Sequence, residues 1–322
     1  MNLKNKNIFV AGHKGMVGSS ICRHLNNLDY RNVLTEEKQK LNLLDQNAVN
    51  NYFNSHKIDF VFLAAAKVGG IYANNEYPAE FIYNNLLIQS NVINACYNNG
   101  IKNLLALGSS CIYPKDCKQP IKEEYLMGGY LEMTNEPYAI AKIAGIKLCE
   151  SYNRQYGTDY RSIMPTNLYG PNDNFHPLNS HVIPGLIQRM HQAKENGLNT
   201  FDVWGSGKAR REFLHVDDLA AACLHVAEMP KSLFNKIVKD QLSHINVGTG
   251  LDISISELAQ ILKEIIKYRG KIQFDIKKPD GPKRKLLSIH KLNKCNWKYT
   301  VELREGLTNT YSWYMSNIVN NA

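Results

Sequence analysis

The chain has 322 residues, of which 44% are hydrophobic, enough for a Rossmann-sized sheet domain and a smaller partner domain. Its formal net charge is +9, but no basic block is interleaved with aromatic residues, which argues against nucleic-acid binding. The sequence shows no long apolar run, we expect no secretory leader, and the seven cysteines form no C-x-x-C pair. We therefore expect a cytoplasmic protein with reduced thiols, no membrane segment and no metal site, whose basic charge suits an anionic small ligand.

A glycine-rich turn opens the chain. Residues 7–11 read as a buried strand, and an apolar helix follows residue 18. Strand, glycine turn and helix in that order are the context that a dinucleotide fingerprint requires. Gly12 permits the tight turn, Gly15 lets the backbone approach a pyrophosphate, and Gly18 lets the helix pack closely on the strand. The N-terminus of the helix then faces the anion.

Further strands are predicted at residues 32–34, 59–66 and 103–108, with helices ending near residue 55 and spanning about 78–100. The continuous apolar run of 59–66 is typical of a parallel sheet, where both faces are buried. The strand at 103–108 runs directly into Ser109, Ser110 and Cys111. Ligands bind outside the carboxyl ends of strands in open parallel sheets, so these side chains are candidates for a site.

A tyrosine and a lysine stand four residues apart on the next predicted helix. Pro137 suits its first turn, so Tyr138 and Lys142 share one face. A phenol titrates near ~10, and a cation ~4 Å away at an effective dielectric of ~20 is worth ~4 kcal/mol. Lys142 is therefore expected to bring the pKa of Tyr138 toward neutral pH, where an acid–base group works best. The alternative is a half-buried tyrosine beside a solvated lysine.

Strands alternating with helices predict an α/β fold with a doubly wound, Rossmann-type parallel sheet. A strand through residue 164 closes the first half, and residues 171–181 are loop-like. A helix follows, then a short strand at 201–205, a strand-to-helix pattern at 213–218 and a strand at 244–248. We expect a Rossmann domain in residues 1–170 whose sheet also receives 212–248. Residues 171–211 and 249–322 would form a smaller C-terminal α/β domain.

The glycine turn with Tyr138 and Lys142 resembles the extended short-chain dehydrogenase/reductases, most of which act on nucleotide sugars. Over nearly the whole chain the resemblance narrows to the GDP-L-fucose synthase family. It rests on residues 12–18, 64–71, 109–114, 135–142, 165–175, 179–184, 204–207 and 211–218. The resemblance implies an NADP-binding Rossmann domain, a substrate domain and a homodimer. It also implies NADPH-dependent reduction at C4 of a GDP-4-keto-6-deoxy sugar, with epimerisation at C3 and C5.

By resemblance, Cys111 and His181 exchange the protons at C3 and C5. Tyr138 protonates the alkoxide, and Lys142 lowers the pKa of Tyr138 and holds the nicotinamide ribose. Ser109 polarises the carbonyl. A thiol and an imidazole suit this task because both can be tuned toward neutrality. From the residues alone, Ser110 is as plausible a donor as Ser109. A lone cysteine is also ordinarily a small buried hydrophobe, and His181 could simply start a helix.

The resemblance also implies the residues that bind cofactor and substrate. The cofactor positions are Gly12, Lys14, Gly15, Met16, Val17, Gly18, Lys38, Leu107, Lys142, Pro165, Asn167 and Leu168. Lys14 and Lys38 favour NADPH, although Glu36 and Glu37 lie near the ribose acid of an NAD enzyme, so NAD remains possible. The positions for the GDP-linked substrate are Arg189, Trp204, Arg211 and Lys285.

Other functions remain open. Residues 281–286 and Ser288 depart from the pattern of the family around the substrate, so the sugar could be a GDP-4-keto-heptose. A C4 reductase without epimerase activity would keep the fold and leave Cys111 and His181 silent. A dehydratase is disfavoured because its acidic pair would stand where Ser109 to Cys111 stand. A non-catalytic NADP-sensing regulator is disfavoured by the intact tyrosine and lysine.

Overall fold

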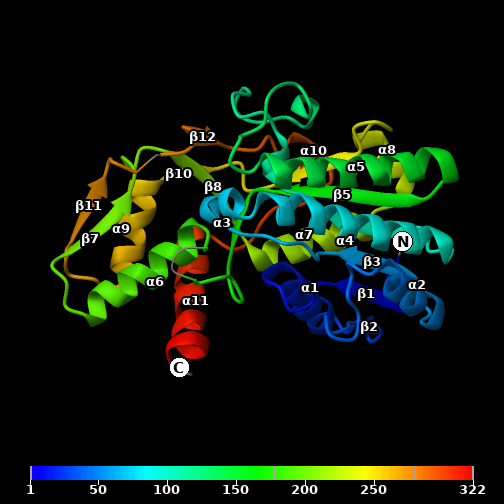
Figure 1. Cartoon of the computed structure of the whole chain (residues 1–322), viewed down its shortest axis with the longest axis horizontal. Coiled ribbons are helices and arrows are strands. Elements are labelled where there is room, and N and C mark those ends of the chain that lie inside the picture. Colours follow the sequence, from blue (N-terminus) through cyan, green and yellow to red (C-terminus); the bar gives the residue numbers. More distant parts are fainter. Residues whose placement is uncertain (1, 177–178, 279, 321–322) are drawn as a thin grey trace.

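The computed structural model describes residues 2–176, 179–278 and 280–320. Figure 1 shows a larger layered α/β part and a smaller part built around α6, α9 and α11. Residues 177–178 of the loop expected at 171–181 lie outside the described residues. Among the described helices, none has the length and apolar character needed to cross a membrane.

The larger part is organised around six strands in the order β2-β1-β3-β4-β5-β9, all paired in parallel. This order confirms the predicted doubly wound α/β class. The polypeptide reverses its direction of winding between β1 and β3, and in such sheets ligands bind in the crevice outside the carboxyl ends of the strands at that point. The strands are β1 (Ile8–Ala11), β2 (Val33–Leu34), β3 (Phe60–Leu63), β4 (Asn103–Leu107), β5 (Asp159–Pro165) and β9 (His244–Val247).

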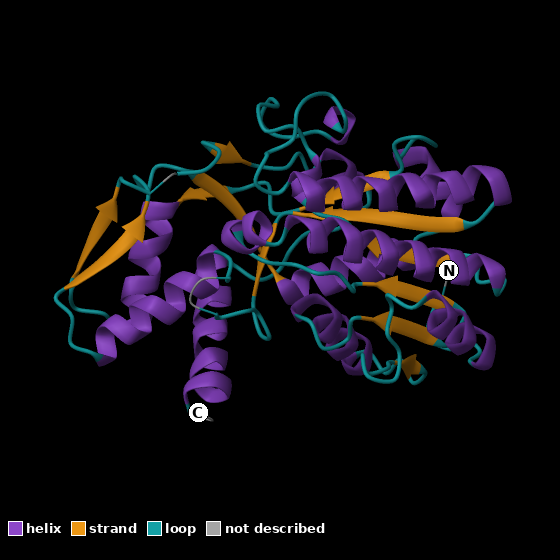
Figure 2. Cartoon of the chain, in the orientation of Figure 1, coloured by secondary structure: helices purple, strands orange, loops and turns teal. Residues whose placement is uncertain are grey.

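Helices cover both faces of this sheet, as Figure 2 shows. Ile8 and Val10 of β1 belong to the hydrophobic core under α1 and α7, whereas Phe9 and Ala11 belong to the core under α2, α4 and α5. Every residue of β1 is therefore buried, which explains the continuous apolar run of the sequence. The helices are α1 (Met16–Asn27), α2 (Gln46–Ser55), α4 (Pro78–Asn98), α5 (Glu136–Tyr156) and α7 (Val216–Glu228).

Three short helices escaped the sequence analysis. They are α3 (Ile71–Glu76), α8 (Lys231–Ile237) and α10 (His290–Lys294), each no more than two turns long. Two 3₁₀ turns, η1 (Ser110–Ile112) and η2 (Glu123–Tyr125), also follow the sheet strands. Segments this short carry too little periodicity for a pattern to distinguish them from loop.

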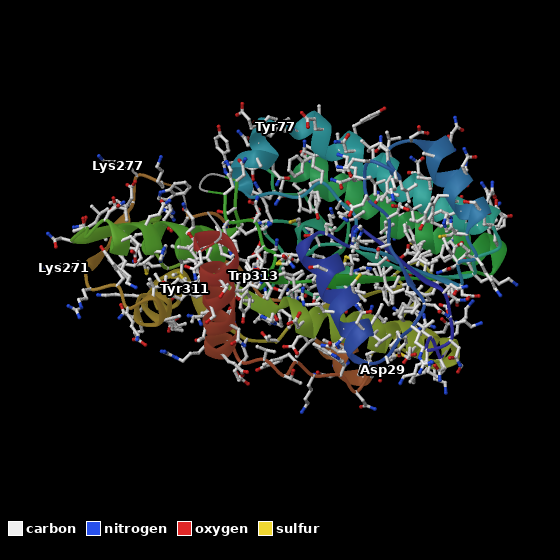
Figure 3. All side chains as sticks on the ribbon, turned by 90° about the horizontal axis from the view of Figure 1, so that it is seen from below. Asp29, Tyr77, Lys271, Lys277, Tyr311 and Trp313 are labelled. Atoms are coloured by element: carbon white, nitrogen blue, oxygen red, sulfur yellow. The ribbon has the colours of Figure 1, made fainter. Side chains whose placement is uncertain are left out.

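The smaller part packs α6 (Val182–Glu195), α9 (Ile255–Ile266) and α11 (Leu303–Tyr314) around one core, with β7 (Thr200–Trp204) paired to β11 (Lys271–Asp275). α9 begins with a capping box between Ser254 and Glu257, which satisfies its first N–H groups. α11 ends in a π-helical turn, η3 (Met315–Val319). Figure 3 shows Tyr311 and Trp313 on α11 and Lys271 at the far end of this part.

A second sheet joins the two parts. β8 (Arg210–His215) pairs with β6 (Asn167–Tyr169), β10 (Asp252–Ser254) and β12 (Arg284–Lys285). The sequence analysis placed residues from 212 onward in the main sheet, but only β9 joins it. β8 pairs instead with β6, which continues the chain directly beyond the end of β5, and this arrangement brings the smaller part over the carboxyl edge of the main sheet.

The C-terminal segment is also shared between the two parts. α10 (His290–Lys294) lies beside β9, and Leu292, Cys295 and Trp297 belong to the core that α7 covers. The expected domain of residues 249–322 is therefore not one continuous body. The chain returns to the Rossmann-type part after β12 and re-enters the smaller part at α11.

Candidate active site

A cavity of about 1460 Å³ lies at the carboxyl ends of the main strands. Its walls come from the glycine turn, the ends of β4 and β5, α5, the start of α6 and β8. Small-molecule pockets ordinarily measure ~300–1,000 Å³, so this one has room for a dinucleotide and a second ligand. Both parts of the molecule contribute residues to it.

The glycine turn is shaped by two close packing contacts and one open position. Gly12 has a φ of +87°, and a Cβ there would lie 2.7 Å from the backbone of Ala65. A Cβ on Gly18 would overlap the carbonyl oxygen of Gly12. A Cβ on Gly15 would meet only that same oxygen, at 3.5 Å. Gly15 therefore leaves space before the N-terminus of α1, whose first turn carries no acidic residue, and this fits a diphosphate.

Charged side chains lie where the adenosine end of a dinucleotide would bind. The Nζ of Lys14 lies 2.6 Å from Oε2 of Glu37, and Nε2 of His13 lies 3.7 Å from the other oxygen of that carboxylate. The hydrogen bond from Lys14 lowers the pKa of Glu37. Glu36 and Lys38 line the same end of the cavity. The carboxylate of Glu37 is therefore ion-paired with Lys14.

Tyr138 and Lys142 are both buried on α5 and both line the cavity. The Nζ of Lys142 donates a hydrogen bond of 2.9 Å to the carbonyl oxygen of Leu107 and lies 5.8 Å from the centre of the Tyr138 ring. Burial lowers the pKa of Lys142 to about 8, an effect that the nearby Cys111 partly offsets.

The expected depression of the tyrosine pKa is wrong for this arrangement. Burial raises the pKa of Tyr138 far above its ordinary value, Cys111 raises it further, and a hydrogen bond with Ser109 lowers it only in part. The loss of hydration is the largest effect, and the ammonium of Lys142 donates its hydrogen bond to the carbonyl oxygen of Leu107. The phenol therefore keeps its proton at neutral pH.

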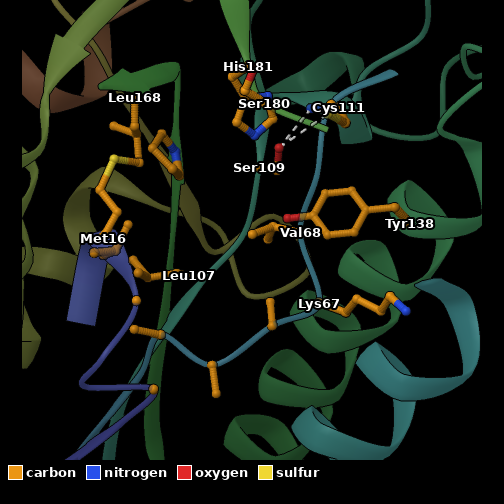
Figure 4. A pocket seen from close by; sticks show the side chains of 18 of the residues that line it. Met16, Lys67, Val68, Leu107, Ser109, Cys111, Tyr138, Leu168, Ser180 and His181 are labelled. Carbon is orange, nitrogen blue, oxygen red and sulfur yellow. Dashed lines mark hydrogen bonds between the residues drawn. The ribbon is translucent and has the colours of Figure 1, made fainter. Parts of the chain in front are cut away.

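Ser109, not Ser110, lies against the phenol and the thiol. Its Oγ donates to Sγ of Cys111 at 3.3 Å and accepts from the backbone N–H of Cys111 at 3.4 Å. Ser110 is only 4% exposed and begins the turn η1. Figure 4 shows the Tyr138 hydroxyl directed to the middle of the pocket, with Ser109, Cys111 and His181 gathered to one side of it. From the sequence alone either serine could have faced the site, and in the structure it is Ser109 that contacts Cys111.

His181 is the N-cap residue of α6 and lines the same cavity. Burial lowers the pKa of its imidazole, and the charge of Lys285 lowers it further. The segment before it is held from the opposite wall, because the N–H of Gly70 donates to the carbonyl oxygen of Asn179 at 3.0 Å. Asn74 in turn donates to the carbonyl oxygens of Gly69 and Gly70.

The sequence analysis assigned no role to Asn74 or Gly70. The pair Gly69-Gly70 was part of the resemblance, but its packing partner is about 110 positions away in the chain, at Ser180. Such a contact has no local sequence signal. We name the contact of residues 69–70 with residues 179–180 the loop clamp.

The cavity wall of the smaller part carries an aromatic ring and several cations. The guanidinium carbon of Arg189 lies 4.8 Å from the centre of the Trp204 ring, and Nζ of Lys278 lies 5.7 Å from it. Arg211 lines the same wall, and burial lowers the pKa values of both Arg189 and Arg211. The sequence analysis missed Lys278, which lies beyond the matched motifs.

The remaining predicted cofactor positions all line the cavity. They are Met16, Val17, Leu107, Pro165, Asn167 and Leu168. Lys285 differs from the other predicted substrate residues, because its Nζ lies 3.9 Å from Sγ of Cys111. No cluster of histidine, cysteine and acidic side chains suited to a metal ion occurs in the described parts of the chain.

Comparison with known proteins gives consistent relationships. Residues 8–248 match the model of the NAD dependent epimerase/dehydratase family. The chain is 55% identical to the GDP-L-fucose synthase of Escherichia coli K12 over 315 residues, with 98% of each protein covered. It is 51% identical to GDP-L-fucose synthase 1 of Arabidopsis thaliana over 320 residues, covering 99% of this chain and 96% of that protein.

Among solved structures, a GDP-mannoheptose C4 reductase from Campylobacter jejuni with NADP bound superposes with a TM-score of 0.89 at 37% identity, covering 98% of this chain and 99% of the other. Sequence and structure relate the chain to the same set of enzymes. The chain therefore belongs to the NAD-dependent epimerase/dehydratase family, the extended short-chain dehydrogenase/reductases, within its GDP-L-fucose synthase group.

Proposed function

We propose that this protein reduces the C4 ketone of a GDP-4-keto-6-deoxy sugar with NADPH after inverting C3 and C5. One observation carries the proposal: Ser109, Cys111, Tyr138 and His181 line one cavity together with the glycine turn. A reductase alone needs only the phenol and a carbonyl donor. A thiol and an imidazole beside them add the two proton-exchanging groups that inversion requires.

The ketone acidifies the protons on its neighbouring carbons. Cys111 and His181 reach the cavity from different elements, η1 and the start of α6, so they can act on opposite faces of the sugar ring. One removes the proton to give an enolate and the other returns it to the second face. Ser109 stabilises the oxygen of the enolate by a hydrogen bond.

Reduction uses the neighbouring pair of side chains. NADPH supplies the hydride that reaches C4 when it is bound. Tyr138, whose raised pKa keeps the phenol protonated, gives its proton to the oxygen that becomes the alkoxide. Lys142, which the carbonyl oxygen of Leu107 holds in place, would bind the nicotinamide ribose.

The cofactor is NADPH. Lys14 and Lys38 at the adenosine end suit a 2′-phosphate, and Lys14 masks the acid that an NAD enzyme would direct at the ribose. The residues of the glycine turn would bind the pyrophosphate through backbone N–H groups. On the opposite wall, Arg189, Trp204 and Arg211 would bind the GDP moiety of the substrate.

The protein is expected to be a cytoplasmic homodimer. All seven cysteines are free, which suits a reducing compartment. Side chains on α4 and α5 expose apolar surface, namely Tyr83, Ile140 and Tyr156. Size-exclusion chromatography with light scattering tests this face, since Ile140→Glu should give a monomer if α5 forms the interface.

The test of the function is turnover of a panel of GDP-4-keto sugars, followed by NADPH absorbance and by NMR of the product. We expect GDP-4-keto-6-deoxy-D-mannose to yield a product inverted at C3 and C5. Preferred use of a GDP-4-keto-heptose, with reduction and no inversion, would instead favour a C4 reductase, as the Campylobacter jejuni relative is named. No turnover with any keto sugar would contradict the proposal.

A further inference from the structure

Lys285 contacts the thiol of the site rather than the wall beside Trp204. Its Nζ lies 3.9 Å from Sγ of Cys111, and its charge also acts on the imidazole of His181. Arg189, Arg211 and Lys278 line the wall beside Trp204. Lys285 thus contacts one of the two groups that the proposed function uses for proton exchange and acts on the other through its charge.

The backbone fixes this lysine firmly. Lys285 pairs with Arg211 across β12 and β8, so its strand is held on one side. The next two residues are buried, and the N–H of Leu286 donates to Gln119 while that of Leu287 donates to the buried carboxylate of Glu212. The Cα of Lys285 is therefore held in place, and from it the partly buried side chain reaches the sulfur.

Several charged or titratable groups face the sulfur. α5 contributes Tyr138 and Lys142, both coupled electrostatically to Cys111, and β12 contributes Lys285. The sulfur therefore has ammonium groups on two different elements around it. Lys142 is already engaged by the carbonyl oxygen of Leu107, whereas the hydrogen bond from Lys285 goes to the sulfur itself.

We propose that Lys285 is a positioning residue for proton exchange: its ammonium, which donates to Sγ of Cys111, stabilises the negative charge that the sulfur carries as the base of this step. This inference deepens the proposed function and rests on it for the identity of the reaction. The sulfur then accepts a proton from the carbon beside the ketone, leaving the enolate. The imidazolium returns a proton to the same carbon from the other face, and solvent restores both groups to their starting forms.

The test measures the thiol without any substrate. Iodoacetamide alkylation of Cys111 is followed against pH by peptide mass spectrometry, because Cys117 also lies near Lys285 and must be resolved from it. Removing the cation beside the sulfur should displace the alkylation profile of Cys111 toward higher pH in Lys285→Gln. A more basic thiolate is also a better nucleophile, so the rate at neutral pH should fall only about threefold, and the profile is the decisive readout.

Two matched variants accompany it. Lys285→Arg keeps the charge and should keep the alkylation profile near that of the wild type. Lys283→Gln removes the same charge from an exposed position two residues earlier and should leave the profile unchanged. With substrate, Lys285→Gln should slow deuterium exchange at C3 and C5 while KM changes by less than about twofold.

Two results would overturn the proposal. An unchanged alkylation profile in Lys285→Gln would show that the lysine does not act on the thiol. A large rise in KM with an unchanged exchange rate would make Lys285 a substrate contact instead. Failure of the proposed function is separate, because it would appear as absent exchange in the wild type while the alkylation profiles still differ.

Discussion

The loop clamp offers a test of how His181 is positioned, through Gly70→Ala. The φ of Gly70 is −65° and its ψ is −179°, a conformation that alanine adopts without strain. The effect of the substitution is therefore steric. The added Cβ would lie 2.5 Å from the carbonyl oxygen of Ser180, where an ordinary contact needs at least 3.4 Å.

The segment before His181 must therefore retreat by roughly 0.9 Å, since its backbone cannot rotate away as a side chain would. Overpacking of this size costs about 1–3 kcal/mol of stability. A misplacement of about 1 Å at a reacting group costs on the order of 10²-fold in rate. Because Tyr138 and Ser109 lie on other elements, reduction should suffer less than proton exchange.

The assay compares the two half-reactions in the same preparation. Deuterium incorporation at C3 and C5 reports exchange, and NADPH oxidation with an already inverted 4-keto sugar reports reduction. Gly129→Ala is the control, because its Cβ would meet only the side chain of Pro114, at 3.3 Å, and no residue of the loop clamp. Equal losses of exchange and reduction in Gly70→Ala, or no loss of exchange, would refute the role of the loop clamp.

The acid–base groups and the cofactor end give three further predictions. Tyr138→Phe should abolish NADPH oxidation and leave deuterium exchange at C3 and C5, and loss of both would argue against separate groups. Since burial places the pKa of Lys142 at about 8, its ammonium is present below that pH, and kcat/KM for reduction should fall as pH rises through it. Lys142→Arg should be slower but should not lose activity over this alkaline range, and a loss that persists in this variant would assign the pH dependence to another group. Lys14→Ala should raise KM for NADPH roughly tenfold and lower KM for NADH by freeing Glu37, whereas equal changes for both cofactors would contradict the assignment.

Local patterns predicted the larger part of the fold. The strand, glycine turn and helix of residues 8–27 could be predicted from that segment alone. Each glycine there either has no room for a Cβ or leaves open space beside the helix N-terminus. The doubly wound order follows from alternating apolar strands and helices. The site at the carboxyl edge was predictable because Ser109 and Cys111 directly follow β4.

What the sequence could not give depends on contacts between distant segments. The pairing of β8 with β6, β10 and β12 combines short pieces from four places in the chain, and none of them has a distinctive period. The position of Lys285 beside Cys111 follows from that pairing. The direction of the Tyr138 pKa likewise depends on burial and on where Lys142 donates its hydrogen bond, which a spacing of four residues does not reveal.

The central claim is that one cavity exchanges protons at two carbons and also reduces the ketone between them. The most direct measurement is incubation of the protein with GDP-4-keto-6-deoxy-D-mannose in D₂O without NADPH, with NMR of the recovered sugar. The wild type should introduce deuterium at both C3 and C5, and Cys111→Ser should introduce little at either. A wild-type protein that reduces the sugar yet leaves both carbons fully protonated would contradict the account.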